Sequence, residues 1–353
     1  MTTIGGFFPI KKEAFHHNFF DSICRQGWDL CFTMSGRCGI CHVLNDMKPN
    51  DARRLAYLPA YTCETVLAPY KKAGYQLAFY EVGKDMTPVF DAQMLSRISV
   101  LSLCGYYGFC NYDRTFVKRC RDQGITVIED ATHSVFSADG IDENCDYIVG
   151  SLRKWLGVPA GGFAIKTGGA FTVPLLPAHQ QHLDLRRSSM QQKENRDDTP
   201  ADRTAAMQIF WDAEMMLRAI FDAYESDRES TEIMKSFDYP RLIRKRRENY
   251  QYLLDHLKTD QRFTIVFPEL KKAAVPSHFT IYHPQRDMVC QYLNERSIHA
   301  TVYWPVNEDI DLSRYPKARF IYEHVLSIPC DQRYGPAEME RICTAFRGMP
   351  DKF

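Results

Sequence analysis

The sequence has no excess of charge of either sign and no long apolar run. Lysine and arginine together number 44, as do aspartate and glutamate, so the formal net charge is zero. A protein that attracts nucleic acid through its bulk charge would be basic, and the balance excludes that class. No apolar run reaches the roughly 18 residues that a membrane-spanning helix needs. We therefore expect neither a nucleic-acid partner nor a membrane span.

The N-terminal segment lacks the charged start, the apolar centre and the small-residue cleavage site of a signal peptide. The chain has 12 cysteines, scattered through strand-like and helix-like segments. Without an export signal we expect these thiols to stay reduced, mostly as small buried side chains, in a cytoplasmic protein. There is no internal repeat and no low-complexity tract, and 353 residues suffice for more than one domain.

Short apolar segments alternate with helix-like segments between residues 30 and 167. This alternation predicts βαβ units and a mostly parallel central sheet with helices on both faces. In such sheets ligands bind at the carboxyl ends of the strands, so we expect the functional site there. The predicted strands are DLCFTM, RLAYLPAY, YQLAFYEV, SVLSLCGYYG, ITVIEDATHS, YIVGS and GGFAIKT.

The rest of the chain has a different character. Residues 168–202 are polar with weak periodicity, which predicts a long loop or an arm. Amphipathic helices are predicted for residues 204–226 and 239–257, and a mixture of short strands and helices follows. We therefore expect a large α/β domain over residues 1–237 and a smaller α+β domain over residues 238–353. The basic run Arg241–Tyr250 predicts a solvated helix face, with an anion or partner contact as the alternative.

Three groups at predicted strand ends could carry chemistry. Asp130 and His133 follow one strand, Lys154 lies between the apolar runs YIVGS and GGFAI, and Ser-Gly-Arg (35–37) precedes a helix. Each alone has an ordinary interpretation, such as a turn cap, a hydrogen-bonded ring, an exposed lysine or a simple turn. Together they offer a Schiff-base amine, an acidic partner for a pyridinium nitrogen and a phosphate-binding helix start. That combination indicates pyridoxal phosphate.

These residues and several longer motifs resemble the DegT/DnrJ/EryC1/StrS family of fold-type I, pyridoxal-phosphate-dependent sugar aminotransferases. The resemblance covers Cys31–Thr167 well and Tyr239–Phe346 loosely. It implies transfer of an amino group from an amino acid, such as glutamate, to a keto-sugar that is nucleotide-linked. It also implies a homodimer with the site near the interface, working in polysaccharide or modified-sugar biosynthesis. The matching motifs are SGR, LPAYTCETVLAPYKKAGY, LCGYYG, VIEDATHS, GSLRKWLGVPAGG, TVYWPV and LSIPCDQRY.

The resemblance also assigns roles to individual residues. Lys154 would bind the cofactor as a Schiff base and move the substrate proton. Asp130 would pair with the pyridinium nitrogen, and His133 would lie near the phenolic oxygen. The phosphate would be held by backbone groups of Gly36 and Arg37 and by the hydroxyl of Ser151.

The sequence departs from the family pattern in three places. Two residues separate Ser151 from Lys154, where the family has four. The aromatic residue that stacks on the cofactor ring is replaced by Cys63, and Tyr61 is the candidate substitute. Residues 168–237 lack the asparagine motif with which many members reach into the partner's site. The resemblance is therefore to a divergent member.

Other interpretations remain open. Cys38 and Cys41 form a Cys-x-x-Cys that could be a redox pair, although two cysteines one helical turn apart also suit a core-facing helix. A metal site with His42 is disfavoured because a second pair of ligands is missing, and we expect no metal. Relatives that dehydrate sugars replace the lysine by histidine, so Lys154 favours transamination. A non-catalytic relative with a binding or regulatory role is the last alternative.

Overall fold

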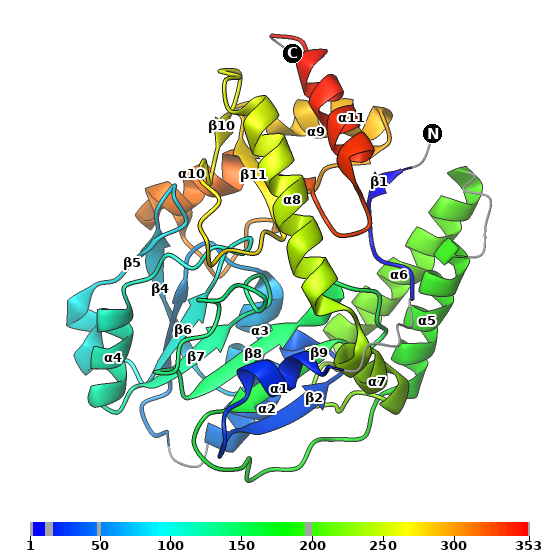
Figure 1. Cartoon of the computed structure of the whole chain (residues 1–353). Helices are drawn as coiled ribbons and strands as arrows, with labels where there is room; N and C mark the ends of the chain where they lie inside the picture. The colour runs from blue at the N-terminus through cyan, green and yellow to red at the C-terminus, as the bar shows by residue number, and fades with distance from the viewer. Residues whose placement is uncertain (1–2, 11–16, 48–50, 195–199, 352–353) are drawn as a thin grey trace.

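The computed structural model describes residues 3–10, 17–47, 51–194 and 200–351. Its centre is an eight-stranded sheet in the order β2-β9-β8-β7-β6-β3-β4-β5 (Figure 1). Strands β9 and β5 run antiparallel to their neighbours and the other pairings are parallel. The strands are β2 (Asp29–Thr33), β3 (Leu55–Pro59), β4 (Gln76–Val82), β5 (Pro88–Val89), β6 (Val100–Cys104), β7 (Thr126–Asp130), β8 (Tyr147–Ser151) and β9 (Gly162–Lys166). The predicted strands and the mostly parallel sheet are confirmed.

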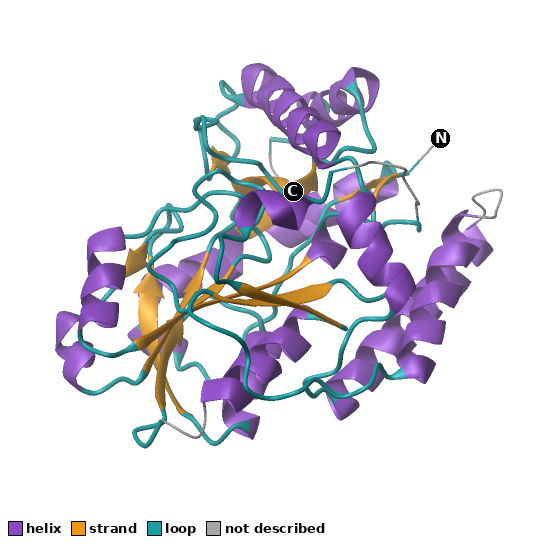
Figure 2. Cartoon of the chain, turned by 60° about the horizontal axis from the view of Figure 1, so that its bottom comes forward, coloured by secondary structure: helices purple, strands orange, loops and turns teal. Residues whose placement is uncertain are grey.

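Helices lie on both faces of this sheet (Figure 2). Because both faces are covered, the central strands are apolar along their length instead of alternating, and every residue of β8 is buried. The helices and 3₁₀ turns of this part are α1 (Phe19–Ile23), α2 (Gly36–Met47), α3 (Glu64–Lys72), η2 (Ala92–Ser96), α4 (Arg114–Asp122), η3 (Leu152–Lys154) and α7 (Arg228–Ser236). None of the helices in the described ranges is long and apolar enough to cross a bilayer.

The C-terminal part has its own antiparallel sheet in the order β10-β11-β13. Strand β1 (Ile4–Gly5), at the start of the chain, pairs with β12 (Ile298–His299) of the C-terminal part. The start of the chain therefore packs against the C-terminal part. The boundary at residues 237 and 238 stays a prediction. Besides β12, the helices, strands and 3₁₀ turn of the C-terminal part are α8 (Tyr239–Leu257), β10 (Thr264–Ile265), β11 (His278–Tyr282), α9 (Arg286–Glu295), η4 (Leu312–Arg314), α10 (Pro316–His324), β13 (Val325–Pro329) and α11 (Pro336–Arg347).

The sequence predicts a long loop or an arm over residues 168–202, and the loop alternative is wrong for residues 180–194. Helix α5 (Gln180–Glu194) forms there and packs beside α6 (Pro200–Ile220), as a hairpin at one side of the molecule (Figure 1). Residues 195–199 lie outside the described ranges. The buried face of α5 has helical spacing, but much of it is polar, so a search for apolar periodicity misses it. Its buried members are His182, Leu183, Arg186, Ser189 and Met190.

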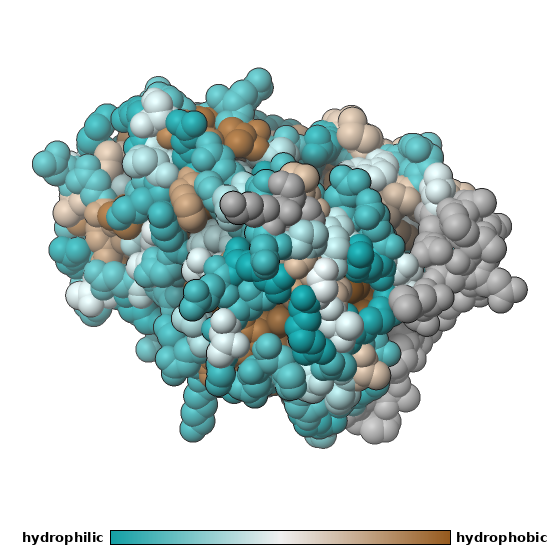
Figure 3. All heavy atoms as spheres, turned by 90° about the horizontal axis from the view of Figure 1, so that it is seen from above, coloured by the Kyte–Doolittle hydropathy of each residue, from teal (hydrophilic) through white to brown (hydrophobic). Residues whose placement is uncertain are grey.

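The face of the molecule that is at the top in Figure 1 is mostly hydrophilic, with separate apolar patches (Figure 3). Among the large apolar side chains that are exposed, three lie on α6 at a spacing of four residues. These are Met207, Trp211 and Met215, with exposed fractions of 39%, 53% and 58%.

Candidate active site

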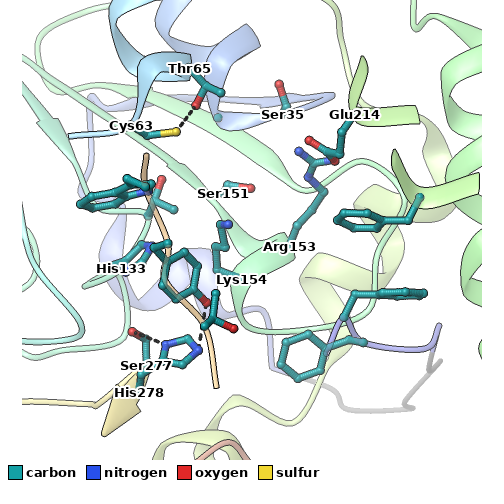
Figure 4. Close-up of a pocket in the computed structure, with 18 of the residues that line it drawn as sticks. Ser35, Cys63, Thr65, His133, Ser151, Arg153, Lys154, Glu214, Ser277 and His278 are labelled. Carbon is teal, nitrogen blue, oxygen red and sulfur yellow. Dashed lines mark hydrogen bonds and ion pairs between the residues drawn. The ribbon is translucent and has the colours of Figure 1, made fainter. Parts of the chain in front are cut away.

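A cavity of about 630 Å³ lies at the carboxyl ends of the central strands (Figure 4). Its walls come from the turns after β7 and β8, the start of α2, the hairpin α5–α6 and loops of the C-terminal part. A cavity of this size suits a cofactor together with a small substrate. Its place at the strand ends is the place predicted from the sequence.

Lys154 ends the turn η3, which joins β8 to the antiparallel strand β9. Burial lowers the pKa of its amine. The Nζ atom lies 4.8 Å from the ring centroid of Tyr303 and has no hydrogen bond or ion pair with a described residue. Glycine is required at 162, because a Cβ there would lie 2.2 Å from the backbone of Ser35. The Gly-Gly pair of the sequence thus lets the lysine turn pack against the turn that starts α2.

Asp130 is the last residue of β7 and is 9% exposed. Burial raises the pKa of its carboxyl group, and hydrogen bonds from Thr132 and the charge of Lys154 act against that rise. One carboxylate oxygen accepts from the backbone N–H of Thr132 at 2.9 Å. The indole N–H of Trp155 donates to the carbonyl of Thr132 at 2.7 Å. This bond ties the aspartate turn to the residue beside Lys154.

His133 is buried among aromatic rings, with Tyr303 at 5.2 Å and Trp304 at 5.6 Å between ring centroids. Its Nδ1 atom is buried and has no hydrogen-bond partner in the described structure. Burial, together with the charges of Lys154 and His278, holds the pKa of His133 well below its ordinary value. The ring is therefore neutral, and a ligand in the cavity could satisfy its free nitrogen.

The predicted phosphate site is assembled at the start of α2. A Cβ on Gly36 would lie 3.3 Å from the Cβ of Ser151, so the helix start and the end of β8 touch. Gly36, Arg37 and Ser151 all line the cavity, and free backbone N–H groups at a helix start attract anions. The side chain of Arg37 turns toward α6, where it donates to the carbonyl of Leu217 at 3.3 Å and lies over the ring of Phe221.

Tyr61 does not reach the cavity, and its expected stacking role is wrong. The side chain is fully buried, and its hydroxyl lies 2.9 Å from that of Tyr107. Cys63 does line the cavity, with its Sγ 3.1 Å from Thr65 Oγ1. The aromatic wall comes instead from Tyr303 and Trp304 of the C-terminal part, which the local strand pattern could not reveal.

Sequence reasoning also missed several charged residues of the walls. Arg246 was expected on a solvated helix face, but it is fully buried and lines the cavity. Its guanidinium lies over the ring of Trp155 and donates to Gln332 Oε1 at 2.8 Å and to the carbonyl of Ser277 at 2.9 Å. Arg153, Arg186 and Glu214 also line the cavity and form an ion-pair cluster. Of these residues, Arg153 could have been found from the sequence, because it stands next to Lys154.

The structure favours the core interpretation of the Cys-x-x-Cys. Cys38 and Cys41 are both buried on α2, and all 12 cysteines are free thiols. Burial raises the pKa of both thiols, which is the opposite of what a reactive redox pair needs. The described residues contain no cluster of three or more histidine, cysteine, aspartate or glutamate side chains that could hold a metal ion. The ring of His42 packs against Phe171.

Residues 234–347 match the model of the DegT/DnrJ/EryC1/StrS aminotransferase family. This is the part in which the sequence resemblance looked looser. A search of curated protein sequences finds no match.

Solved structures cover the whole chain. Helicobacter pylori PseC, an aminotransferase involved in the biosynthesis of pseudoaminic acid, is 13% identical over 100% of both chains, with a TM-score of 0.70. The PLP form of the putative sugar aminotransferase Spr1654 from Streptococcus pneumoniae is 14% identical over 98% of this chain and 92% of that one, with a TM-score of 0.65. DesV from S. venezuelae, in complex with a ketimine intermediate, is 16% identical over 93% and 86%, with a TM-score of 0.62.

These likenesses establish the fold over the entire chain, and the family model matches its C-terminal third. The resemblance seen in the sequence is borne out in two respects: the chain has the fold of these solved aminotransferases, and its residues 234–347 match the model of the DegT/DnrJ/EryC1/StrS aminotransferase family.

Proposed function

We propose that the chain is a pyridoxal-phosphate-dependent aminotransferase that acts on a sugar. The observation that carries the proposal is the unpaired, desolvated amine of Lys154 inside a cavity of cofactor size. The surrounding residues fit the group. Asp130 ends the neighbouring strand, His133 offers a free ring nitrogen, and Gly36 opens a helix where a phosphate could be held.

The chain's own residues would divide the work by their environments. A lowered pKa makes Lys154 available as a neutral amine that can hold the cofactor covalently and then accept and return a substrate proton. Asp130 would face the ring nitrogen and keep it protonated. Pyridoxal phosphate, when bound, supplies the electron sink for the reaction. Tyr303 and Trp304 would exclude water from one side of the cavity.

We further propose an amino acid, such as glutamate, as donor and a nucleotide-linked keto-sugar as acceptor, in polysaccharide or modified-sugar biosynthesis. Both substrates are anionic, and the cavity wall carries more cations than acids. The cations are Arg37, Arg153, Arg186, Arg218, Arg246 and Arg333. The acids are Glu64, Asp130, Glu214 and Asp331. The free thiols are compatible with the cytoplasm, which we propose as the location.

We also propose a homodimer that covers the apolar stripe of Met207, Trp211 and Met215 on α6. Met207 and Trp211 are exposed and also line the cavity, so a second copy seated there would lie at its mouth. Sedimentation should show a dimer that Trp211→Glu dissociates. A wild-type monomer at micromolar concentration would refute this part.

The function is tested by following the cofactor through each half-reaction. The purified chain, loaded with pyridoxal phosphate, is mixed with glutamate and other amino acids, and the loss of the visible band is recorded. Keto-sugars, free and nucleotide-linked, are then added to restore the band. A band that an amino acid removes and a keto-sugar restores supports the proposal. A bound cofactor that no amino acid converts would leave a binding or regulatory role.

A further inference from the structure

Two arginines that line the cavity share a single carboxylate. Arg153 Nη1 lies 3.0 Å from Glu214 Oε1, and Arg186 Nη1 lies 3.2 Å from the same oxygen. Arg153 belongs to the turn η3, Arg186 to α5 and Glu214 to α6, so the cluster joins the lysine turn to the hairpin. The side chains of Arg153, Arg186 and Glu214 are 14%, 5% and 23% exposed.

The cluster carries an uncompensated positive charge. Burial would raise the pKa of Glu214, but the two arginines outweigh it and lower that pKa to about 2, so the carboxylate is charged. Burial and the charge of Arg153 lower the pKa of Arg186 to about 9, which still leaves it protonated at neutral pH. Two guanidiniums thus face one carboxylate. A buried charge without a counter-charge is costly, so the arrangement favours an anion.

The same arginines have hydrogen-bond donors to spare. The Nε atoms of Arg153 and Arg186 are buried and have no partner among the described residues. The Nε of Arg37, in the adjoining wall, is also unpartnered. All three side chains line the cavity. Guanidinium groups bind phosphate and carboxylate oxygens in pairs, so these donors suit an oxyanion.

The cluster also lies beside the start of α2. Figure 4 shows Arg153 and Glu214 next to Ser35 and Ser151, with Lys154 nearby. An anion held there could meet the arginines on one side and free backbone N–H groups on the other.

We propose that Arg153 and Arg186, held in place by Glu214, form an oxyanion subsite of this cavity. The ligand is a phosphate or carboxylate group, supplied either by the cofactor or by an anionic substrate. This choice of sources rests on the proposed function, whereas the anion site itself does not.

Inorganic phosphate is the direct probe of the subsite. Its affinity is measured by calorimetry on the full chain and on Arg153→Gln and Arg186→Gln, each checked for folding by circular dichroism. We expect the dissociation constant to rise about tenfold or more, the loss typical of one charge-assisted hydrogen bond. The matched control is Arg187→Gln, on the same helix, whose guanidinium pairs with Asp184, Asp227 and Glu229 and does not line the cavity. Equal phosphate affinity in all four proteins would overturn the proposal.

Glu214→Gln separates an anion site from a purely structural ion pair. The amide oxygen of the glutamine can still accept from both guanidiniums and keep them in place, while the loss of the negative charge raises the local positive charge, so phosphate should bind as tightly as in wild type or several-fold tighter. A folded Glu214→Gln chain that loses phosphate binding as strongly as the arginine variants would contradict the subsite. If Glu214→Gln does not fold, the comparison of the arginine variants with Arg187→Gln decides.

Pyridoxal phosphate and pyridoxal, which lacks the phosphate, distinguish the sources. If the cofactor supplies the oxyanion, Arg153→Gln and Arg186→Gln weaken binding of pyridoxal phosphate and leave pyridoxal unchanged. If a substrate supplies it, both cofactor forms bind as before and the KM of the donor or acceptor rises. A wild-type chain that binds phosphate through these arginines but no pyridoxal phosphate would end the proposed function and keep the subsite. A wild-type chain that binds pyridoxal phosphate tightly, but whose phosphate affinity does not depend on these arginines, would end the subsite and keep the proposed function.

Discussion

Two walls of one cavity are built from different kinds of sequence. The wall at the ends of β7 and β8 follows strands that are buried and apolar along their length, and its reactive residues stand at the strand ends. The wall made by α5 and α6 buries His182, Arg186 and Ser189 along a helix face. His182 Nδ1 lies 3.0 Å from the carbonyl of Ala213 on the facing helix. Apolar periodicity reveals the first kind of wall and conceals the second, because buried polar side chains interrupt the apolar pattern of its helix face.

The largest effect is expected from replacing Lys154, which lies in the wall at the ends of β7 and β8. Lys154→Ala should reduce the rate of amino-group transfer on the order of 10³-fold or more, since both the covalent attachment and the proton transfer are lost. Its free energy of unfolding should stay the same or rise, because a desolvated amine is removed. Stopped-flow absorbance and urea unfolding measure the two quantities. The control is Lys258→Ala on the surface, and equal activity in both variants would contradict the assignment.

The second largest effect is expected from replacing Asp130, the last residue of β7. Asp130→Asn keeps the shape of the side chain but removes its charge, so the half-reaction with the amino donor should slow by about 10²-fold or more. The exposed Asp184→Asn serves as control. A normal rate in Asp130→Asn would show that the carboxylate does not act on the cofactor ring.

Removing one of the few apolar contacts of the wall made by α5 and α6 should destabilise the folded chain. Leu183 of α5 is fully buried in a small cluster with Met34, Cys38 and Leu217. Leu183→Ala should lower the free energy of unfolding by about 3 kcal/mol, through lost burial and the cavity that remains.

Ser189→Ala, on the same helix, sharpens that test. The hydroxyl of Ser189 is buried and has no hydrogen-bond partner among the described residues. Its removal should leave stability unchanged or raise it by up to about 1 kcal/mol. Urea unfolding of both variants compares them. Similar losses in the two would show that polar contacts, not apolar packing, hold α5 in place.

The smallest expected effect is the pH dependence of the second wall. The pKa of Glu214 is lowered to about 2 in the folded chain, below its ordinary value. Its contribution to stability is therefore complete above the unfolded pKa of roughly 4.3 and is lost as the pH falls toward 2. Urea midpoints between pH 6 and pH 3 should fall less in Glu214→Gln than in wild type. An identical slope in both proteins would contradict the role of this carboxylate.

Much of the fold and part of the site could be predicted from the sequence for a physical reason. The central strands are determined by local apolar runs, and Asp130, His133, Ser151 and Lys154 stand at their ends, where a parallel sheet gathers ligands. The contributions of Tyr303 and Trp304 could not be foreseen, because they come from loops far away in the chain. The failure at Tyr61 has the same origin: its side chain faces Tyr107 in the core, a choice made by tertiary packing.

The charged residues of the walls illustrate a second limit. Arg246 belongs to a run that reads as a solvated helix face, yet Gln332, Ser277 and Trp155 enclose its guanidinium. Burial of an arginine depends on partners that local sequence does not name.

The most direct test of the account is the site of covalent attachment. The chain is incubated with pyridoxal phosphate, reduced with borohydride and digested, and the peptides are mapped by mass spectrometry. We expect a visible absorption band in wild type, absent from Lys154→Ala, and the reduced cofactor on the peptide that contains Lys154. A label spread over surface lysines, with the same band in Lys154→Ala, would contradict the central claim.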